Sequence, residues 1–251
     1  MHDIKKYFSP LIKALKELSI DCVFKNESLV VSSKENTVSI SFNSNDLNKN
    51  TSTVTVPIDH IISRHEKIIP IILSKLNLNK TIFARNCIVQ KIDKTTAKYF
   101  FDKWHFFGST TSAYNYGLFY KNELVGAASF SKGRSMNRLA IGKQSFELIR
   151  FCCKSGITVT GGLSKLMKHF YDEKKAGDIM TYVDKQFSNG DSFIKAGFKK
   201  HSDTPPLSFL VNKKTFKRTL LKNKDENFDA TLFYRVENLG NAKMIYTPNE
   251  K

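Results

Sequence analysis

The chain has 251 residues, of which 41% are hydrophobic and 12% aromatic, so it can bury a core without disulfides. Lysine and arginine number 40 against 23 aspartate and glutamate, which gives a formal net charge of +17. This excess favours DNA or RNA as a partner, although a lysine- and asparagine-rich composition would produce the same charge. The sequence has no signal-peptide pattern and no apolar run of about 18 residues, so we expect a cytoplasmic protein without membrane contact.

The four cysteines do not suggest a metal site. Cys152 and Cys153 are adjacent, Cys22 and Cys87 are isolated, and none forms the CxxC spacing typical of zinc ligands. We therefore predict no bound metal and a reducing compartment.

Residues 1–80 are predicted to form a small helix-plus-β-meander domain and a linker helix. The stretch 4–20 has apolar residues at three- and four-residue spacing, which predicts a helix. The stretches 22–33 and 36–44 alternate like strands, and 43–53 is expected to be a polar loop. A helix is expected over 60–79, with Pro70 either kinking it or starting a second helix.

Residues 81–251 are predicted to form a second domain with a basic C-terminal extension. Its first half should contain a strand within 80–93, a helix over 94–106 opened by Thr95 or Thr96, and a hairpin over 115–131. The hairpin turn is expected at Lys121–Glu123, and a basic connection follows at 132–144.

The second half of this domain alternates strands and helices. The expected order is strand 145–153, loop 155–162, helix 163–175, strand 179–184, loop 185–190, short helix 191–198 and strand 207–212. Strands that alternate with helices after an antiparallel hairpin predict an α+β fold, with a mixed sheet flanked by helices.

The double glycine Gly161-Gly162 precedes a predicted helix. Glycines allow backbone N–H groups to approach a ligand closely, and the start of a helix attracts anions. A phosphate site would then comprise Thr160, Gly161, Gly162, Ser164 and Lys165. A simple turn is the alternative, and the spacing does not match a P-loop.

Two segments resemble the cofactor motifs of the GNAT superfamily of N-acetyltransferases. They are "GITVTGGLSKLMKHF" and "SNGDSFIKAGFKK", in the order found in that superfamily. The resemblance implies a GNAT-like sheet and a glycine turn after its fourth strand that cradles the pyrophosphate of acetyl-CoA or of another acyl donor. The tyrosine that often serves as general acid in the superfamily corresponds to Phe193.

Residues 80 to 250 resemble, more closely, a GNAT-like domain of phage proteins that is often attached to homing-endonuclease or very-short-patch-repair-like nucleases. The matching runs include "FELIRFCC", "IMTYVDKQFSNG", "DTPPLSFLV" and "FYRVENLGNAKMIY". The chain is similar, more distantly, to the phage Mu Mom protein, which modifies the exocyclic amine of adenine in DNA. These resemblances imply a transferase of phage or mobile-element origin that modifies an amine on DNA.

The resemblance also implies site residues. The implied catalytic residues are His105 beside Trp104, Glu147, Arg150 and Asp184. The implied residues of the donor site are Ser188, Asn189 and Gly190, and Ser109 matches the segment that contains His105.

Each proposed catalytic residue also has a plainer explanation. His105 is either a general base or a ring packed beside Trp104, and Asp184 either orients an amine or caps a turn. Glu147 and Arg150 point to opposite faces of a regular strand, so they share a pocket only if a bulge intervenes. Arg150 binds a phosphate or carboxylate, or forms a surface ion pair.

Two basic segments flank this domain and are predicted to contact nucleic acid. Their residues are Arg134 and Arg138 in the first, and Lys213, Lys214, Lys217 and Arg218 in the second. Solvated surface is the alternative for both.

The N-terminal segment has no carboxylate cluster for a nuclease metal. A non-catalytic nucleic-acid-binding module and a nuclease-associated or counter-defence protein therefore stay open as alternative functions.

Overall fold

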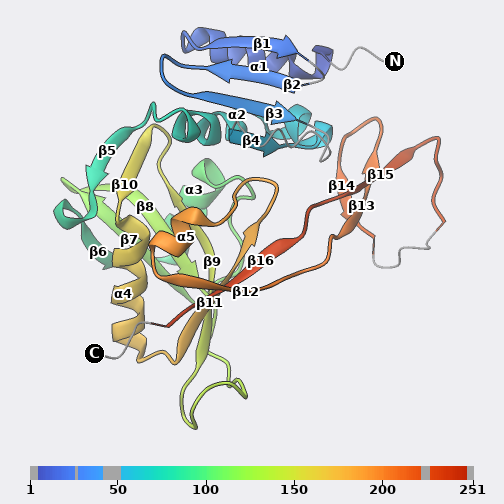
Figure 1. Cartoon of the computed structure of the whole chain (residues 1–251). Coiled ribbons are helices and arrows are strands. Elements are labelled where there is room, and N and C mark those ends of the chain that lie inside the picture. The colour runs from blue at the N-terminus through green and yellow to red at the C-terminus, as the bar shows by residue number, and fades with distance from the viewer. Residues whose placement is uncertain (1–4, 26–27, 42–51, 222–226, 248–251) are drawn as a thin grey trace. The chain divides into compact units, whose positions relative to one another are not determined.

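The structure is a computed structural model that describes residues 5–25, 28–41, 52–221 and 227–247 (Figure 1). Contacts divide the chain into two compact units. Unit 1 contains Met1–Leu78, Asp184–Asn189 and Thr204–Asn241, and unit 2 contains Asn79–Val183, Gly190–Asp203 and Ala242–Lys251. The units are therefore not contiguous in sequence, whereas our division into 1–80 and 81–251 assumed contiguous segments and stays a prediction.

Unit 1 begins with a helix and a small sheet. Its first elements are α1 (Lys5–Glu17), β1 (Asp21–Lys25), β2 (Ser28–Ser32), β3 (Thr37–Ser41), β4 (Ser52–Thr55) and α2 (Ile58–Lys75). The strands β1 to β3 form the expected antiparallel meander, and β4 adds a parallel strand beside β3. Phe8, Leu11 and Leu15 of α1 are fully buried, as their spacing predicts.

Two expectations for this part of the chain have different outcomes, and only that for the helix break is wrong. The loop expected over 43–53 lies outside the described residues up to position 51, and β4 begins at Ser52. The kink in α2 is at Arg64, where φ is −144° and ψ is 26°, and Pro70 lies inside the helix beyond it. Pro70 removes one donor from the helix, but the local break precedes it by more than a turn.

Unit 1 also contains a three-stranded antiparallel sheet. Its strands are β13 (Ser208–Asn212), β14 (Arg218–Leu220) and β15 (Phe233–Glu237), with β13 in the middle. The strand expected over 207–212 is confirmed. The strands β14 and β15 come from the basic and aromatic tail, for which no strand was predicted.

Unit 2 is built on a seven-stranded mixed sheet of order β12-β16-β11-β9-β8-β7-β6. The strands are β6 (Ile88–Lys91), β7 (Tyr114–Tyr120), β8 (Glu123–Phe130), β9 (Ser145–Cys153), β11 (Asp178–Asp184), β12 (Phe198–Asp203) and β16 (Asn241–Tyr246). The helices are α3 (Lys94–Trp104), α4 (Gly162–Lys174) and α5 (Asp191–Lys195). The α+β fold with a mixed sheet flanked by helices is confirmed.

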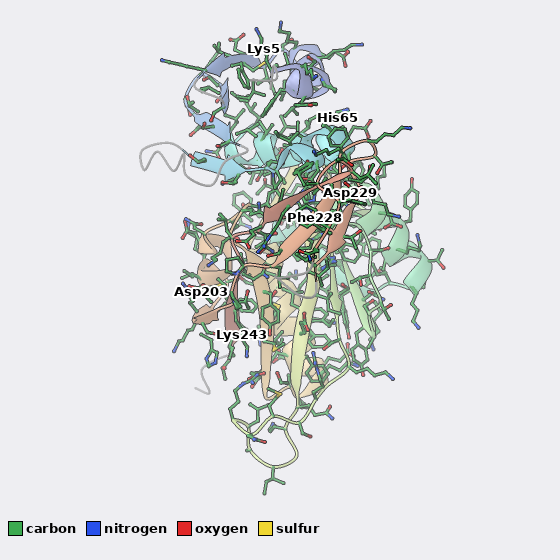
Figure 2. All side chains as sticks on the ribbon, turned by 90° about the vertical axis from the view of Figure 1, so that its right-hand side faces the viewer. Lys5, His65, Asp203, Phe228, Asp229 and Lys243 are labelled. Carbon is green, nitrogen blue, oxygen red and sulfur yellow. The ribbon has the colours of Figure 1, made fainter. Side chains whose placement is uncertain are left out.

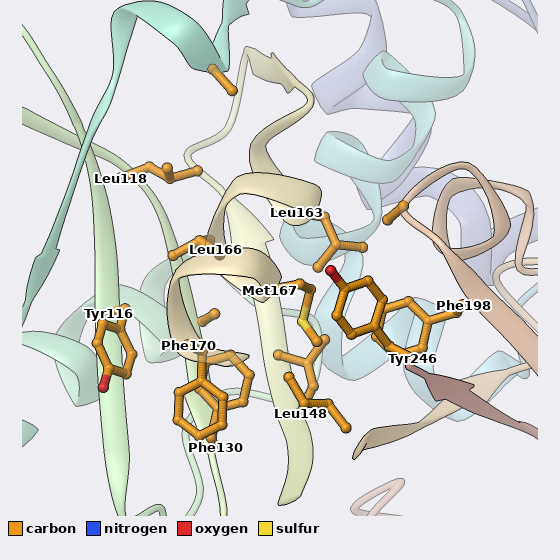
Figure 3. Close-up of a cluster of buried hydrophobic side chains, with 14 of the residues drawn as sticks. Tyr116, Leu118, Phe130, Leu148, Leu163, Leu166, Met167, Phe170, Phe198 and Tyr246 are labelled. Atoms are coloured by element: carbon orange, nitrogen blue, oxygen red, sulfur yellow. The ribbon is translucent and has the colours of Figure 1, made fainter. Parts of the chain in front are cut away.

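The two longer helices of unit 2 contribute to different hydrophobic clusters. Leu166, Met167 and Phe170 of α4 pack with one set of sheet residues, and Figure 3 shows this cluster. Phe130 and Phe170 stack with ring centroids 3.8 Å apart and planes 4° apart. Phe100 and Phe101 of α3 pack with Ala127 in a second cluster. The consecutive β8 residues Ala127 and Ala128 belong to different clusters. Because consecutive side chains of a strand point to opposite faces, α3 and α4 cover opposite faces of the sheet.

Local capping and turn geometry refine the predicted boundaries. The helix α3 is capped by Asp93, whose Oδ1 accepts a hydrogen bond of 2.8 Å from the Thr96 N–H, and not by Thr95 or Thr96. The hairpin turn has only two residues, Lys121 and Asn122, both at positive φ, and Glu123 already belongs to β8.

The segment expected to be a loop over 155–162 contains a strand. It is β10 (Ile157–Thr160), which pairs in parallel with β5 (Lys80–Phe83). The β-branched run favours extended backbone, but the partner strand lies far away in the sequence, so its pairing was not visible there. A short 3₁₀ turn, η1 (Ala84–Asn86), connects β5 to β6.

The parallel neighbours β9 and β11 pair over a short length. The paired positions are Asp178 to Met180 with Ser145 to Glu147, although β9 has 9 residues and β11 has 7. Thr181 adds a hydrogen bond of 2.9 Å from its Oγ1 to the Leu148 carbonyl. At one edge of the sheet, β12 pairs antiparallel with β16, and the two strands carry charged side chains such as Asp203 and Lys243 (Figure 2).

No helix among the described residues is long and apolar enough to cross a membrane.

Candidate functional site

The glycine turn begins helix α4. Gly161 is the N-cap residue with φ of +77°, a left-handed conformation that glycine adopts without strain. The first hydrogen bond of the helix runs from the Lys165 N–H to the Gly161 carbonyl. The N–H groups of Gly162, Leu163 and Ser164 therefore have no acceptor within the helix, and such groups bind anions.

Gly162 is required for close packing. A Cβ atom at this position would lie 2.9 Å from Leu118 Cδ1 and 3.0 Å from Val159 Cβ. A Cβ at Gly161 would meet only Ala84 Cβ, at 3.6 Å. Glycine is therefore favoured at the two positions for different reasons. At Gly161 the reason is the backbone conformation, and at Gly162 it is the close approach of the helix to the sheet.

Ser164 and Lys165 lie beside a second feature of α4. They line an open groove of about 670 Å³, together with Cys87, Ile88, Val89, Lys168, His169 and Asp172. The Lys165 ammonium donates to the carbonyl oxygens of Ala84, at 2.9 Å, and of Cys87. Lys165 therefore fixes the η1 turn next to the start of α4, and Ser164 is the more available of the two for a ligand.

A bulge interrupts β9 between the two residues predicted to share a pocket. Ser129 pairs with Arg150 and Phe130 pairs with Leu148, so Ile149 is the extra residue. The bulge changes the alternation of side chains, which allows Glu147 and Arg150 to lie on the same face. Arg150 Nη1 donates to the carbonyl of the bulged Ile149 at 2.9 Å.

Glu147 and Arg150 are held by contacts from distant parts of unit 2. Arg150 Nε donates to the Gly108 carbonyl at 3.1 Å, and burial lowers the pKa of the guanidinium while nearby Glu147 raises it. Arg134 Nη2 lies 3.2 Å from Glu147 Oε2, and the Ser131 hydroxyl accepts from the Glu147 N–H at 2.9 Å. The Glu147 side chain is 25% exposed, so solvent or a substrate can reach it.

His105 follows the last residue of α3 and is linked to Arg150 through Gly108. Its Nδ1 accepts a hydrogen bond of 3.2 Å from the Phe107 N–H, and its ring packs edge-on against Phe101 with centroids 6.1 Å apart. Its carbonyl accepts from the Gly108 N–H, and Gly108 in turn contacts Arg150. The half-buried ring packs against Phe101, and both the packing beside Trp104 and the catalytic role stay predictions.

Asp184, Ser188 and Asn189 belong to unit 1, whereas Gly190 belongs to unit 2. Asp184 Oδ1 accepts from the Gln186 N–H at 2.9 Å, and the Asp184 carbonyl accepts from the N–H groups of Phe187 and Ser188. Burial raises the pKa of the Asp184 carboxyl, against the hydrogen bond from Gln186. Asp184 thus caps the turn after β11, which was the alternative considered from sequence.

All three arginines predicted to contact nucleic acid pair with carboxylates of the protein, and Arg134 does so with Glu147. Arg138 forms a bidentate pair with the buried Asp178, with distances of 2.7 and 3.1 Å. Arg218 forms a bidentate pair with the buried Asp59, with both distances 2.9 Å. Such pairs leave few donors for a phosphate backbone.

The three lysines predicted to contact nucleic acid are exposed. Lys214 and Lys217 lie on the surface of the β13–β14 turn, and Lys213 Nζ donates to the Ala230 carbonyl at 2.6 Å. Phe216, at φ of +54°, packs edge-on against Tyr7 with centroids 6.1 Å apart.

Phe193 stands where the resemblance implies a proton donor. Its ring packs edge-on against Phe198 with centroids 5.6 Å apart, and it contacts the core cluster under α4. The described residues contain no group of three or more His, Cys, Asp or Glu side chains that could hold a metal ion.

The structure thus groups Arg134, Glu147, Arg150 and the loop after His105 in unit 2, with the glycine turn in the same unit. Sequence reasoning missed Gly108 and Ser131, which hold Arg150 and Glu147. No sequence signal pointed to them, because the contact from Arg150 to Gly108 spans 42 residues.

No protein-family model matches the sequence, and no curated protein matches it. Among solved structures, the chain is similar to Arabidopsis thaliana Naa50 in complex with a bisubstrate analogue, with 12% identity, 64% of this chain and 99% of that chain covered, and a TM-score of 0.42. It is also similar to a GNAT family acetyltransferase from Elizabethkingia anophelis with acetyl-CoA bound, at 13% identity, 64% and 97% coverage and a TM-score of 0.38.

A third similar structure is the ribosomal-protein-S18-alanine N-acetyltransferase from Escherichia coli, at 10% identity, 66% and 96% coverage and a TM-score of 0.39. Similarity at this level assigns neither an activity nor a substrate to the chain.

Proposed function

We propose that the protein is a GNAT-like acyltransferase that transfers an acyl group from acetyl-CoA or another acyl donor to an amine. One observation carries the proposal. The fourth strand of the seven-stranded sheet in chain order, β9, is bulged at Ile149, pairs with β11 over three positions, and is followed along the chain by the glycine-led helix α4. The sequence resemblance implies a glycine turn after the fourth strand at the donor site.

The start of α4 fits the phosphates of such a donor. Gly161 turns the chain without a side chain, and Gly162 lets the first turn of the helix lie directly against Val159. The N–H groups of Gly162, Leu163 and Ser164 would donate to phosphate oxygens, helped by the helix dipole. Lys165 contributes by holding the η1 turn in place.

When bound, the donor supplies an acyl thioester whose carbonyl carbon an amine can attack. Glu147 is the residue we assign to take a proton from that amine, because its carboxylate is partly exposed. Arg150 positions this part of β9 through the carbonyl groups of Ile149 and Gly108. Phe193 has no proton to give, so the leaving thiolate must take its proton from another group or from water.

We further propose that the amine is carried by nucleic acid, as an exocyclic amine of a nucleobase, and that the protein has a phage or mobile-element origin. The formal net charge of +17 and the exposed Lys214 and Lys217 support a polyanionic acceptor.

Two measurements test the transferase. Calorimetry with acetyl-CoA should detect binding that weakens in Gly162→Val, where the larger side chain displaces the start of α4. Mass spectrometry of DNA nucleosides from cells that express the protein should detect an acyl-type mass increase that is absent with Glu147→Gln. Unmodified nucleosides together with no binding of acetyl-CoA would contradict the proposal.

A second function is favoured by one specific observation. Phe193 occupies the position of the usual proton donor and is a partly buried ring packed against the core, which suits a nucleic-acid-binding module on a non-catalytic scaffold. This alternative predicts a DNA affinity that falls steeply with salt and is the same for the wild type and Glu147→Gln. A nucleoside modification that depends on Glu147 would reject it.

A further inference from the structure

A pocket lies between α3 and the segment that leads into β7. We call it the α3 pocket; it has a volume of about 380 Å³. Its lining residues are Lys94, Ala97, Lys98, Phe101, Ser109, Thr110, Thr111, Ser112 and Asn115. This volume is within the range of small-molecule sites. Ser109, a site residue implied by the resemblance, lines it, but none of the residues predicted for the donor or for nucleic-acid contact does.

The charged groups of the pocket have one sign. Lys94 and Lys98 are four residues apart on α3, so both ammonium groups lie on the same side of the helix. The lining contains no carboxylate. Lys94 is exposed and has no acidic partner among the described residues, and Lys98 pairs with Asp102 at 2.5 Å on the surface. An exposed pair of this kind is weak, so Lys98 can turn to a bound anion at little cost.

Among the uncharged polar groups, the hydroxyls of Thr110 and Thr111 can donate to an anion, whereas the Ser109 hydroxyl bonds the Asp102 carboxylate. Four consecutive hydroxyl residues, Ser109–Ser112, form one wall. Ser112 Oγ donates to Asn115 Oδ1 at 2.8 Å. The other polar group of the Asn115 side chain is its amide nitrogen. Ser129 pairs with Asn115 across the strands, and its buried Oγ has no hydrogen-bond partner among the described residues. The sheet floor at this position is therefore polar and incompletely satisfied.

Ala97 and Phe101 form an apolar wall opposite these groups. A ligand that combines an anionic group with a flat apolar part matches such a lining. The pocket also adjoins the Glu147–Arg150 pair, because Ser109 lines it and the neighbouring Gly108 carbonyl holds Arg150.

We propose that the α3 pocket binds a phosphate group carried by a nucleotide, with the ammonium groups of Lys94 and Lys98 and the hydroxyl groups of Thr110 and Thr111 as its ligands. Phosphate oxygens accept several strong hydrogen bonds, and ammonium and hydroxyl groups supply them. The role of this pocket in placing a nucleotide acceptor near Glu147 rests on the proposed acyl transfer. The binding of phosphate itself does not depend on that transfer.

The test uses the full chain and three probes: inorganic phosphate, AMP and a short single-stranded oligodeoxynucleotide. Binding should shift the backbone amide resonances of residues 109–112 for all three. The affinity should fall about tenfold or more in the Lys94→Gln/Lys98→Gln double variant, because two charge-assisted hydrogen bonds are lost. The control is Lys103→Gln, which removes one positive charge from α3 at a position that does not line the pocket.

A second variant tests the pocket without removing a ligand. Asp102→Asn keeps the Oδ1 acceptor of the Ser109 N–H, whose hydrogen bond is 2.8 Å, and removes the charge that pairs with Lys98. Phosphate and AMP should then bind more tightly than in the wild type. Unchanged or weaker binding would count against the assignment of Lys98 as a ligand.

The outcomes separate the sources of the phosphate and the two proposals. If AMP binds and the oligonucleotide does not, the site is supported and its ligand is a free nucleotide. If the oligonucleotide binds more tightly than AMP, the ligand is nucleic acid. No shift at residues 109–112 with any probe, or equal losses in the double variant and in Lys103→Gln, overturns the phosphate site. Calorimetry with acetyl-CoA on the same proteins tests the acyl donor separately, so either proposal can fail alone.

Discussion

Arg218 and Asp59 form a buried bidentate ion pair, with Nε to Oδ2 and Nη2 to Oδ1 both at 2.9 Å, although 159 residues separate them in the sequence. The Asp59 side chain is 1% exposed and that of Arg218 is 14% exposed. The pair joins the start of α2 to strand β14 within unit 1.

Removing one partner of this pair should be costly. We expect Asp59→Asn to lower the free energy of unfolding by about 3–5 kcal/mol, because Arg218 would then be a buried and uncompensated charge. Urea unfolding measures the change. The matched control is Asp172→Asn, which breaks the exposed Lys168–Asp172 pair and should change stability by less than about 1 kcal/mol. Equal effects of the two variants would contradict the structural role of the buried pair.

His60 should make stability depend on pH. Burial, and next the charge of Arg218, lower the pKa of His60 from 6.5 to about 4. Between these values the unfolded chain binds the proton and the folded chain does not, so stability falls as the pH is lowered from above 6.5 towards 4. The loss at the acid end is about 3 kcal/mol.

The measurement is chemical unfolding at several pH values, with His60→Gln as the comparison. The difference in unfolding free energy between wild type and variant should change across this window and be constant above it. A difference that is the same at every pH would show that His60 titrates alike in both states.

The glycine turn should respond differently at its two positions. We expect Gly161→Ala to cost about 1 kcal/mol because of its positive φ, and Gly161→Asn to cost less, since asparagine tolerates this conformation. Gly162→Ala should cost about 1–3 kcal/mol, because its Cβ would meet Leu118 and Val159. Thermal unfolding of the three variants checks this order. A tolerated alanine at Gly162 would mean that α4 can move away from the sheet.

Ser129 is expected to be replaceable. Its hydroxyl is buried without a hydrogen-bond partner among the described residues, so Ser129→Ala should leave stability unchanged or raise it by about 1 kcal/mol. The control is Ser112→Ala, which removes the donor to Asn115 Oδ1 and should destabilise by about 1 kcal/mol. Unfolding free energies from denaturant titration compare the two. A marked loss in Ser129→Ala would reveal a partner for this hydroxyl, such as a bound water.

Local patterns predicted most of the helices and several strands. The spacing of Phe8, Leu11 and Leu15 predicted α1, and the hairpin β7–β8 followed from its alternation around a turn. The same reasoning misplaced the cap of α3 and the break in α2, because Asp93 and Arg64 depend on hydrogen bonds and dihedral angles that neighbouring residue types only bias.

The sequence by itself determined the basic charge, the α+β class and the order in which strand, glycine turn and helix follow one another. These follow from composition, periodicity and the freedom of glycine, which act over a few residues. Only the tertiary structure decided that β10 pairs with β5, that the bulge at Ile149 turns Glu147 and Arg150 to one face, and that Arg218 binds Asp59 instead of facing solvent. Each of these depends on a partner tens of residues away, whose position is fixed by packing and not by local preference.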